Sequence, residues 1–223
     1  MSRVGIMGGT FNPIHIGHLL LAECAREELQ LDEVWFIPTG VSYMKAGKND
    51  RPDESMPSAE DRLKMTELAI RENPFFRCLD IEVRRAGATY TYETLEVLKD
   101  KYPEHSFYFI CGADCLYTID RWRSPDRIFA NCTLAAAVRG DALLSEMEEQ
   151  KRRLERDFQA NIAVLPFRNL ELSSTEIRDR IRSDRSVSYM LPGAVQRYIE
   201  EKGFYKNDRA QENTESNGED AGP

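Results

Sequence analysis

The sequence predicts an α/β protein in which helices flank both faces of a doubly wound, mostly parallel sheet within a single domain. Short apolar runs of strand length alternate with helical patterns along most of the 223-residue chain, as in sheets of parallel strands joined by helices. The runs at 107–111 and 133–138 are almost entirely apolar, which is typical of strands covered on both faces. A glycine-rich turn links the first strand to the first helix, where doubly wound sheets bind ligands.

The expected strands are short apolar segments bounded by turn residues. In chain order they cover residues 3–7, 33–37, 75–80, 81–84, 107–111, 133–138 and 162–165. Pro38 ends the second strand, because proline cannot donate to a strand ladder. The polar loop at 39–57 that follows is long enough to suggest a functional segment.

The expected helices show apolar side chains three or four residues apart. They cover residues 16–29, 58–72, 91–102, 141–158, 174–183 and 192–202. In the first helix, Leu20, Leu21 and Ala25 are assigned to one apolar face. Ser58 and Asp61 resemble a capping box at the start of the second.

The charge balance and the cysteines limit the class of protein. The chain has 38 acidic and 30 basic side chains and a formal net charge of −8, whereas a free-standing nucleic-acid binder needs basic surface. Five cysteines without a Cys-x-x-Cys pair argue against a disulfide framework or a zinc ribbon. No apolar run reaches the roughly 18–20 residues of a membrane span, and no secretory signal begins the chain. We therefore expect a cytoplasmic protein without nucleic-acid or membrane partners.

Residues 207–223 differ from the rest of the chain. They contain no aromatic, branched aliphatic, leucine or methionine residue, and five acidic residues against one basic. Such a segment cannot bury enough apolar surface to offset its ordering entropy. We expect a disordered acidic tail at 207–223 and a folded domain at 1–206, whose helical part at 174–206 ends the domain.

The turn after the first strand reads Gly8-Gly-Thr-Phe-Asn-Pro-Ile-His-Ile-Gly-His18. Gly8 and Gly9 allow backbone N–H groups to approach a phosphate, and the helix start adds partial positive charge. Neither the Gly-x-Gly-x-x-Gly fingerprint nor a P-loop is present. His15 and His18 can face one point, which favours a polyphosphate site over one capping and one packing histidine. Zinc needs a third ligand, and the only other histidine, His105, is far along the chain.

Gly-Thr-Phe-x-Pro-x-His-x-Gly-His resembles the hallmark of the nucleotidyltransferase superfamily named for its His-x-Gly-His motif. The resemblance implies a Rossmann-like sheet and places His15 and His18 on the transferring α-phosphate of a nucleoside triphosphate. It also implies backbone contacts to the phosphates from Gly8, Gly9, Thr10 and Phe11. Asn12 stands where most relatives have aspartate, at a turn position that both residues can fill.

A second segment, Leu172-Ser-Ser-Thr-Glu-Ile-Arg178, follows the last strand and begins a helix. One of its serines is expected to cap the helix, and Arg178 is expected on the first turn, where a cation opposes the helix dipole unless an anion lies between them. A plain capped helix is the alternative. The segment looks like the second superfamily motif, which implies that the β- and γ-phosphates of ATP are held by Ser173, Ser174, Thr175 and Arg178. Lys45 matches a lysine of the family, which implies a further phosphate ligand, although by itself this residue is explained equally well as a solvated lysine.

Gly112-Ala-Asp114 follows a central strand, and Trp122 comes eight residues after the aspartate. A carboxylate at a strand end can bind ribose hydroxyls, whereas Trp122 alone is explained as well by a core position. This spacing resembles one branch of the superfamily, the nicotinate mononucleotide adenylyltransferases, in which the tryptophan stacks on the pyridine ring.

The segment 87–95 supports the same branch. It reads as a β-turn into a capped helix, and the family usually has Pro-Ser-Tyr-Thr where Ala88 and Thr89 begin the motif. The resemblance implies that the nicotinate carboxylate binds backbone amides of Thr89, Tyr90 and Thr91. A helix N-terminus favours an anion by about 0.3–1 kcal/mol, which a neutral nicotinamide would not gain.

The implied reaction is adenylyl transfer from ATP to nicotinate mononucleotide, giving deamido-NAD and pyrophosphate by direct in-line attack. Mg²⁺ is expected with ATP, held mainly by phosphate oxygens and water, so no metal site of the protein itself is expected. An adenylyltransferase for nicotinamide mononucleotide or phosphopantetheine is the alternative within the superfamily, and a non-catalytic nucleotide-binding regulator is the alternative outside it. The oligomeric state, a homo-oligomer included, stays open.

Overall fold

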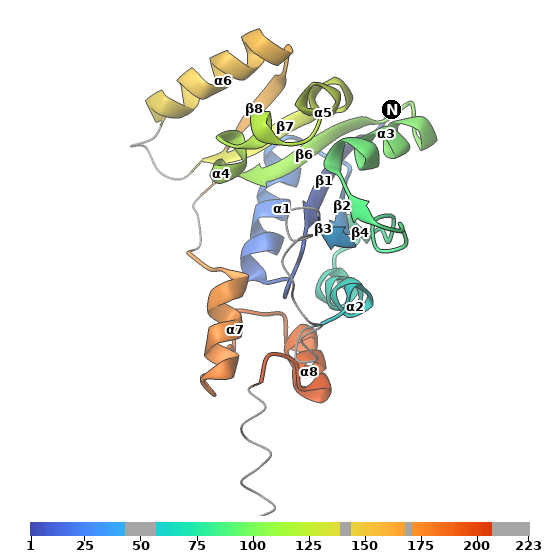
Figure 1. Ribbon diagram of the computed structural model, residues 1–223. Coiled ribbons are helices and arrows are strands. Elements are labelled where there is room, and N and C mark those ends of the chain that lie inside the picture. The colour runs from blue at the N-terminus through green and yellow to red at the C-terminus, as the bar shows by residue number, and fades with distance from the viewer. Residues whose placement is uncertain (43–56, 139–143, 168–170, 207–223) are drawn as a thin grey trace, which may run out of the picture.

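Six parallel strands form the central sheet of the computed structural model (Figure 1). The strands are β1 Arg3–Gly9, β2 Glu33–Pro38, β4 Phe76–Cys78, β6 Ser106–Gly112, β7 Thr133–Val138 and β8 Asn161–Pro166. Their order across the sheet is β4-β2-β1-β6-β7-β8, so the chain winds outward from β1 in one direction and from β6 in the other. The structure describes residues 1–42, 57–138, 144–167 and 171–206.

Helices connect the strands and cover both faces of the sheet (Figure 1). They are α1 Ile16–Glu28, α2 Ala59–Ile70, α3 Thr91–Lys101, α4 Ala113–Leu116, α5 Pro125–Asn131, α6 Leu144–Phe158, α7 Ser174–Arg182 and α8 Gly193–Lys202. A 3-10 turn, η1 Ile119–Arg121, lies between α4 and α5. The doubly wound α/β fold is confirmed, and the six predicted helices lie within three residues of their predicted bounds.

Each face of the sheet has its own hydrophobic core, because successive strand residues point to opposite sides. In β2, Val34 and Phe36 join the core that includes side chains of α1, α2, α7 and α8. Trp35 and Ile37 join the other core, with side chains of α3, α5 and α6. Coverage on both sides explains why the central strands are continuous apolar runs.

Local sequence patterns predict the start of α2 correctly and the buried face of α1 only in part. Ser58 Oγ accepts a hydrogen bond from the Asp61 amide at 3.1 Å, and Asp61 Oδ2 accepts one from the Ser58 amide at 3.1 Å, forming the predicted capping box. In α1, however, Leu20 is 40% exposed, whereas Ala22 and Ala25 are fully buried. The helix turns these small side chains towards the core, so the assignment of Leu20 to the apolar face is wrong.

Residues 81–84 are not extended, contrary to the prediction. The Arg84 amide donates to the Asp80 carbonyl at 2.9 Å, and the Arg85 amide donates to the Glu82 carbonyl at 3.2 Å, so the chain turns here. The next short strand is β5 Ala88–Thr89, which pairs in parallel with β3 Val41–Ser42 inside the expected 39–57 loop. The sequence also did not predict α4, η1 and α5. Pairing partners and two-turn helices are set by the surrounding structure more than by periodicity.

No helix in the described part of the chain is long and apolar enough to cross a membrane. The five cysteines are free thiols, and Cys132 is the one that is buried. The expected tail at 207–223 and most of the expected loop lie outside the described residues.

Candidate active site

The carboxyl ends of β1 and β6 meet at the centre of the sheet. The two strands are neighbours, and the connections that follow them lead to opposite halves of the sheet. Such a switch point opens a crevice for ligands. Gly8 and Gly9 end β1, and Gly112 ends β6, so three glycines singled out by the sequence lie here.

Residues 8–15, called the glycine-rich turn below, comprise the last two residues of β1 and the connection from β1 to α1. Phe11 has a φ of 48°, in the left-handed region, and the Asn12–Pro13 peptide bond is cis. The buried Phe11 ring lies 5.1 Å from the His18 ring and 6.0 Å from the Phe36 ring, centroid to centroid. The turn is therefore anchored in the core by a side chain, while the role of its backbone as a phosphate ligand stays a prediction.

Arg62 of α2 holds one end of the glycine-rich turn. Its Nη1 donates to the Thr10 carbonyl at 2.7 Å and its Nη2 to the Gly40 carbonyl at 3.0 Å. The side chain is 6% exposed, and burial lowers the pKa of its guanidinium. Within the described ranges no carboxylate pairs with it, so a buried positive charge lies against the turn.

The C-terminal part of the chain holds the other end of the turn. Arg178 Nη1 donates to the Asn12 carbonyl at 2.7 Å, and Ser174 Oγ donates to the Pro13 carbonyl at 2.9 Å. The Tyr205 hydroxyl donates to Asn12 Oδ1 at 2.6 Å. These donors hold the turn through its carbonyl groups and through the side chain of Asn12.

His15 and His18 stack on each other at the entry to α1. Their ring centroids are 3.7 Å apart, with an interplanar angle of 28°. The His15 amide donates to His18 Nδ1 at 3.2 Å. Since Nδ1 accepts this bond, neutral His18 carries its proton on Nε2. The predicted pair is thus brought together, with His18 Nε2–H as a hydrogen-bond donor.

Burial keeps both histidines neutral in the free protein. It lowers the pKa of His15 to about 4 and, with the neighbouring His15 charge, the pKa of His18 to about 3. His15 Nδ1 is also buried without a hydrogen-bond partner in the described structure. A bound polyanion would oppose this effect, because a nearby negative charge favours the protonated ring.

The N-terminus of α7 lies against the same turn. Ser173 is the cap, with its Oγ accepting from the Glu176 amide at 3.1 Å. Ser174 and Thr175 are the first two helical residues, so their N–H groups have no intrahelical acceptor. Arg178 is the fifth residue of the helix and not on its first turn, which corrects the prediction. Its side chain nevertheless reaches back, because helical side chains tilt towards the N-terminus, and Nη2 donates to Thr175 Oγ1 at 3.1 Å.

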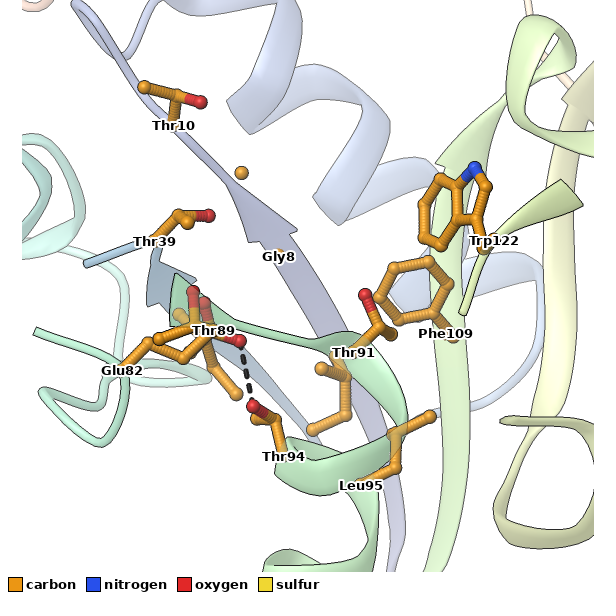
Figure 2. Close-up of a pocket in the computed structure, with 13 residues that line it drawn as sticks. Gly8, Thr10, Thr39, Glu82, Thr89, Thr91, Thr94, Leu95, Phe109 and Trp122 are labelled. Atoms are coloured by element: carbon orange, nitrogen blue, oxygen red, sulfur yellow. Dashed lines mark hydrogen bonds between the residues drawn. The ribbon is translucent and has the colours of Figure 1, made fainter. Parts of the chain in front are cut away.

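A cavity of about 210 Å³, called the α3 cavity below, extends from the glycine-rich turn to the start of α3 (Figure 2). Its wall contains six predicted site residues: Gly8, Gly9, Thr10, Thr89, Thr91 and Trp122. The Trp122 ring meets Phe109 edge to face, with centroids 6.1 Å apart. Residues predicted for phosphate and for nicotinate are therefore walls of one cavity.

Glu82 also lines the α3 cavity and was missed by the sequence reasoning. It is 8% exposed and accepts a hydrogen bond from Thr94 Oγ1 at 2.8 Å (Figure 2). The Thr89 side chain also hydrogen-bonds to it, and burial raises the pKa of the carboxyl. Its only signal in the sequence is an acidic residue between Ile81 and Val83.

The remaining predicted residues lie outside the cavity wall. Tyr90 is the residue before α3, and the Arg123 guanidinium lies 5.3 Å from the centre of its ring. Gly112 and the exposed Asp114 lie at the end of β6 and the start of α4. Lys45 is outside the described residues.

A doubly wound sheet with a His-x-Gly-His turn at its switch point is the arrangement of a nucleotidyltransferase, and the cytidylyltransferase-like family matches this chain over residues 6–180. The chain is 40% identical over 205 residues to a protein of Lachnoclostridium phytofermentans named "probable nicotinate-nucleotide adenylyltransferase", covering 92% of this chain and all of that protein. A protein of Dehalococcoides mccartyi with the same name is 41% identical over 91% of this chain and 97% of its own length. The chain belongs to the nicotinate-nucleotide adenylyltransferase family.

Solved structures agree on the fold. Nicotinic acid mononucleotide adenylyltransferase of Plasmodium falciparum, complexed with NaAD, superposes with a TM-score of 0.72 over 92% of this chain and 98% of that chain. The same protein complexed with APC gives a TM-score of 0.71. The identities are 19% and 18%, so this likeness concerns the fold.

Proposed function

We propose that the protein transfers the adenylyl group of ATP to nicotinate mononucleotide, giving deamido-NAD and pyrophosphate. One observation carries the proposal: the glycine-rich turn and the start of α3, with Trp122, are walls of a single cavity at the switch point. A triphosphate on the turn and a pyridine ring beside Trp122 would then lie within reach of each other. The relatives' shared name supports the same substrates.

The nucleophile is a phosphate oxygen of the mononucleotide. A phosphate monoester has a second pKa of about 6, so this oxygen is ionised at neutral pH and no general base is needed. The tasks left to the protein are to bring two anions into line and to stabilise the charge of the transition state.

We assign this stabilisation to His15 and His18. Neutral His18 can donate from Nε2 to an α-phosphate oxygen, and the developing charge would raise the pKa of the stacked rings. Burial makes such a donor more effective than it would be in water. Backbone N–H groups of the glycine-rich turn, from Gly8 to Phe11, would bind the remaining phosphate oxygens.

The N-terminus of α7 is proposed to hold the leaving pyrophosphate. The N–H groups of Ser174 and Thr175 have no intrahelical acceptor, Ser173 caps the helix, and Arg178 brings a cation to the same end. Partial positive charge at a helix start suits an anion. Lys45 is proposed as an additional phosphate ligand.

The two nucleosides would occupy the flanks of the switch point. Gly112 and Asp114 are proposed to bind the ribose of ATP. Trp122 is proposed to stack on the pyridine ring, and the amides of Thr89, Tyr90 and Thr91 to bind the nicotinate carboxylate.

Mg²⁺ is proposed to neutralise charge on the triphosphate. Among the described residues, no group of three or more His, Cys, Asp or Glu side chains is arranged to hold a metal ion. Its proposed ligands are phosphate oxygens and water, which Mg²⁺ commonly keeps. We further propose that the enzyme is cytoplasmic and that residues 1–206 form its nucleotidyltransferase domain.

The test is pyrophosphate release from Mg-ATP with nicotinate mononucleotide, nicotinamide mononucleotide and phosphopantetheine in parallel. We expect the highest kcat/KM with nicotinate mononucleotide. Equal kcat/KM values for nicotinate and nicotinamide mononucleotide would contradict selection for the carboxylate. Pyrophosphate release with phosphopantetheine alone would overturn the proposal.

A further inference from the structure

The start of α3 already holds a negative group of the protein. Thr94 in the first turn of the helix and Thr89 just before it both hydrogen-bond to the Glu82 side chain. The helix N-terminus that should favour a nicotinate carboxylate therefore also faces a buried carboxyl. Figure 2 shows Glu82 and Thr94 on the same side of the cavity.

In the part of the chain that the structure describes, two charged side chains act on this carboxyl. Arg85 and Glu93 act on it with opposite sign, and they pair with each other at 3.3 Å. Among the described residues that line the α3 cavity, Glu82 is the only ionisable one. The side facing β2 contributes Thr39 and Gly40, neither of which is charged.

The backbone of Glu82 has little freedom to withdraw. A Cβ at Gly40 would lie 2.3 Å from the Glu82 carbonyl oxygen, so the two backbones are in close contact. Arg62 fixes Gly40 from the other side, through its carbonyl at 3.0 Å. With its backbone in this contact and its side chain bonded to Thr89 and Thr94, the Glu82 carboxyl lies where a second carboxylate entering the cavity would meet it.

We propose that Glu82 is a specificity-determining residue, which takes up one proton from solvent when nicotinate mononucleotide binds and none when nicotinamide mononucleotide binds. This inference rests on the proposed function. It explains how the subsite for the pyridine ring distinguishes the carboxylate of nicotinate mononucleotide from the carboxamide of nicotinamide mononucleotide. Two carboxylates in one buried site cannot both stay ionised at low cost, so one takes a proton. The nicotinate carboxyl is the stronger acid, so the proton goes to Glu82. Protonated Glu82 also gains an O–H donor for the substrate carboxylate.

The preference for nicotinate mononucleotide should then depend on pH. Where Glu82 is ionised in the free protein, its affinity relative to nicotinamide mononucleotide falls by up to about tenfold per pH unit as pH rises. The phosphate of the mononucleotide and the histidines titrate too, but both ligands share these contributions. The difference between the two ligands therefore isolates the carboxyl.

The experiment is titration calorimetry of each mononucleotide at about pH 8.5 in two buffers with different ionisation enthalpies. We expect nicotinate mononucleotide to bind with nearly one more proton taken up than nicotinamide mononucleotide. In Glu82→Gln this difference should vanish, and the ratio of the two dissociation constants should no longer change with pH.

Thr94→Val provides a second variant in case Glu82→Gln does not fold. Removing one donor disfavours the ionised carboxyl in the free protein, so the proton uptake should be smaller than in the wild type. Equal uptake for both ligands in the wild type, or an unchanged difference in Glu82→Gln, would overturn the inference. Neither result would touch the proposed function, which fails only if nicotinate mononucleotide is not adenylylated.

Discussion

The glycine-rich turn and the α3 cavity adjoin at the same switch point but are built differently. The turn is held by side chains of α2 and α7 and by Tyr205, which follows α8, and these donate to its carbonyl groups and to the Asn12 side chain. The cavity wall beside α3 is made of apolar and hydroxyl side chains with one buried carboxyl, Glu82. Among the described residues, the guanidinium groups of Arg62 and Arg178 thus lie at the turn, and one carboxyl lies in the cavity wall.

This contrast separates two tasks. A rigid turn with neutral, buried histidines and nearby guanidinium groups suits charge that develops during reaction, because fixed dipoles need no reorganisation. A small cavity with few polar groups suits recognition, because each polar group left unpaired by the wrong ligand is costly. Substitutions in the turn should therefore lower kcat, and those beside α3 should change substrate preference.

The largest effect is expected for His18→Ala. Loss of one donor to transition-state charge costs about 10²–10³ in kcat, while the KM for nicotinate mononucleotide should change little. Steady-state pyrophosphate release measures both. His105→Gln, outside the site, is the control and should retain activity; a normal kcat in His18→Ala would refute the assignment.

Arg178→Ala should rank second. A hydrogen bond to a charged group contributes about 1.5–3 kcal/mol, which corresponds to about 10- to 150-fold in kcat/KM for ATP. The matched control is Arg182→Ala on the same helix, whose guanidinium pairs with Asp179 at 3.0 Å. If both variants lose activity equally, the positive charge of α7 as a whole affects activity, and Arg178 has no specific role at the N-terminus of the helix.

The two histidines also predict how stability depends on pH. Their pKa values in the folded protein lie below the ordinary 6.5, so the unfolded chain binds more protons as pH falls from 6.5 towards 4. The free energy of unfolding should decrease over this range by up to about 1.4 kcal/mol per pH unit for each histidine. The free energy of unfolding of the wild type and of His18→Asn can be measured by urea denaturation between about pH 7.5 and pH 4, each relative to its own value at about pH 7.5. The decrease should be shallower in His18→Asn. Parallel curves would contradict the buried, neutral state of His18.

The smallest effect is expected for Trp122→Ala. Loss of ring stacking costs about 0.5–1.5 kcal/mol beyond area, or roughly 2- to 12-fold in the KM for nicotinate mononucleotide. The KM for ATP should stay unchanged, and Trp122→Phe should restore most of the loss. A rise in the KM for ATP alone would contradict the assignment of Trp122 to the pyridine ring.

The sequence predicted the elements with long-range periodicity and the motifs that are contiguous in the chain. The six longer helices, the six strands of the central sheet, the capping box at Ser58 and the histidine pair all follow from neighbouring residues. The turn at 81–84 and the strand at 88–89 do not follow from neighbouring residues. The apolar pattern at 81–84 does not distinguish a turn from a strand, and the two-residue strand at 88–89 is defined by its partner, Val41–Ser42.

The sequence by itself determined the fold class and the candidate chemistry of the turn, since alternating apolar patterns and the His-x-Gly-His motif are local properties. Only the tertiary structure decided which groups surround that chemistry. Arg62 and Tyr205 reach the turn from positions 52 and 193 residues away from their bonded partners. Glu82 reaches the wall of the α3 cavity from a turn that no periodicity predicts. Such contacts depend on how the whole sheet folds, which is why a single buried carboxyl could be found only in the folded protein.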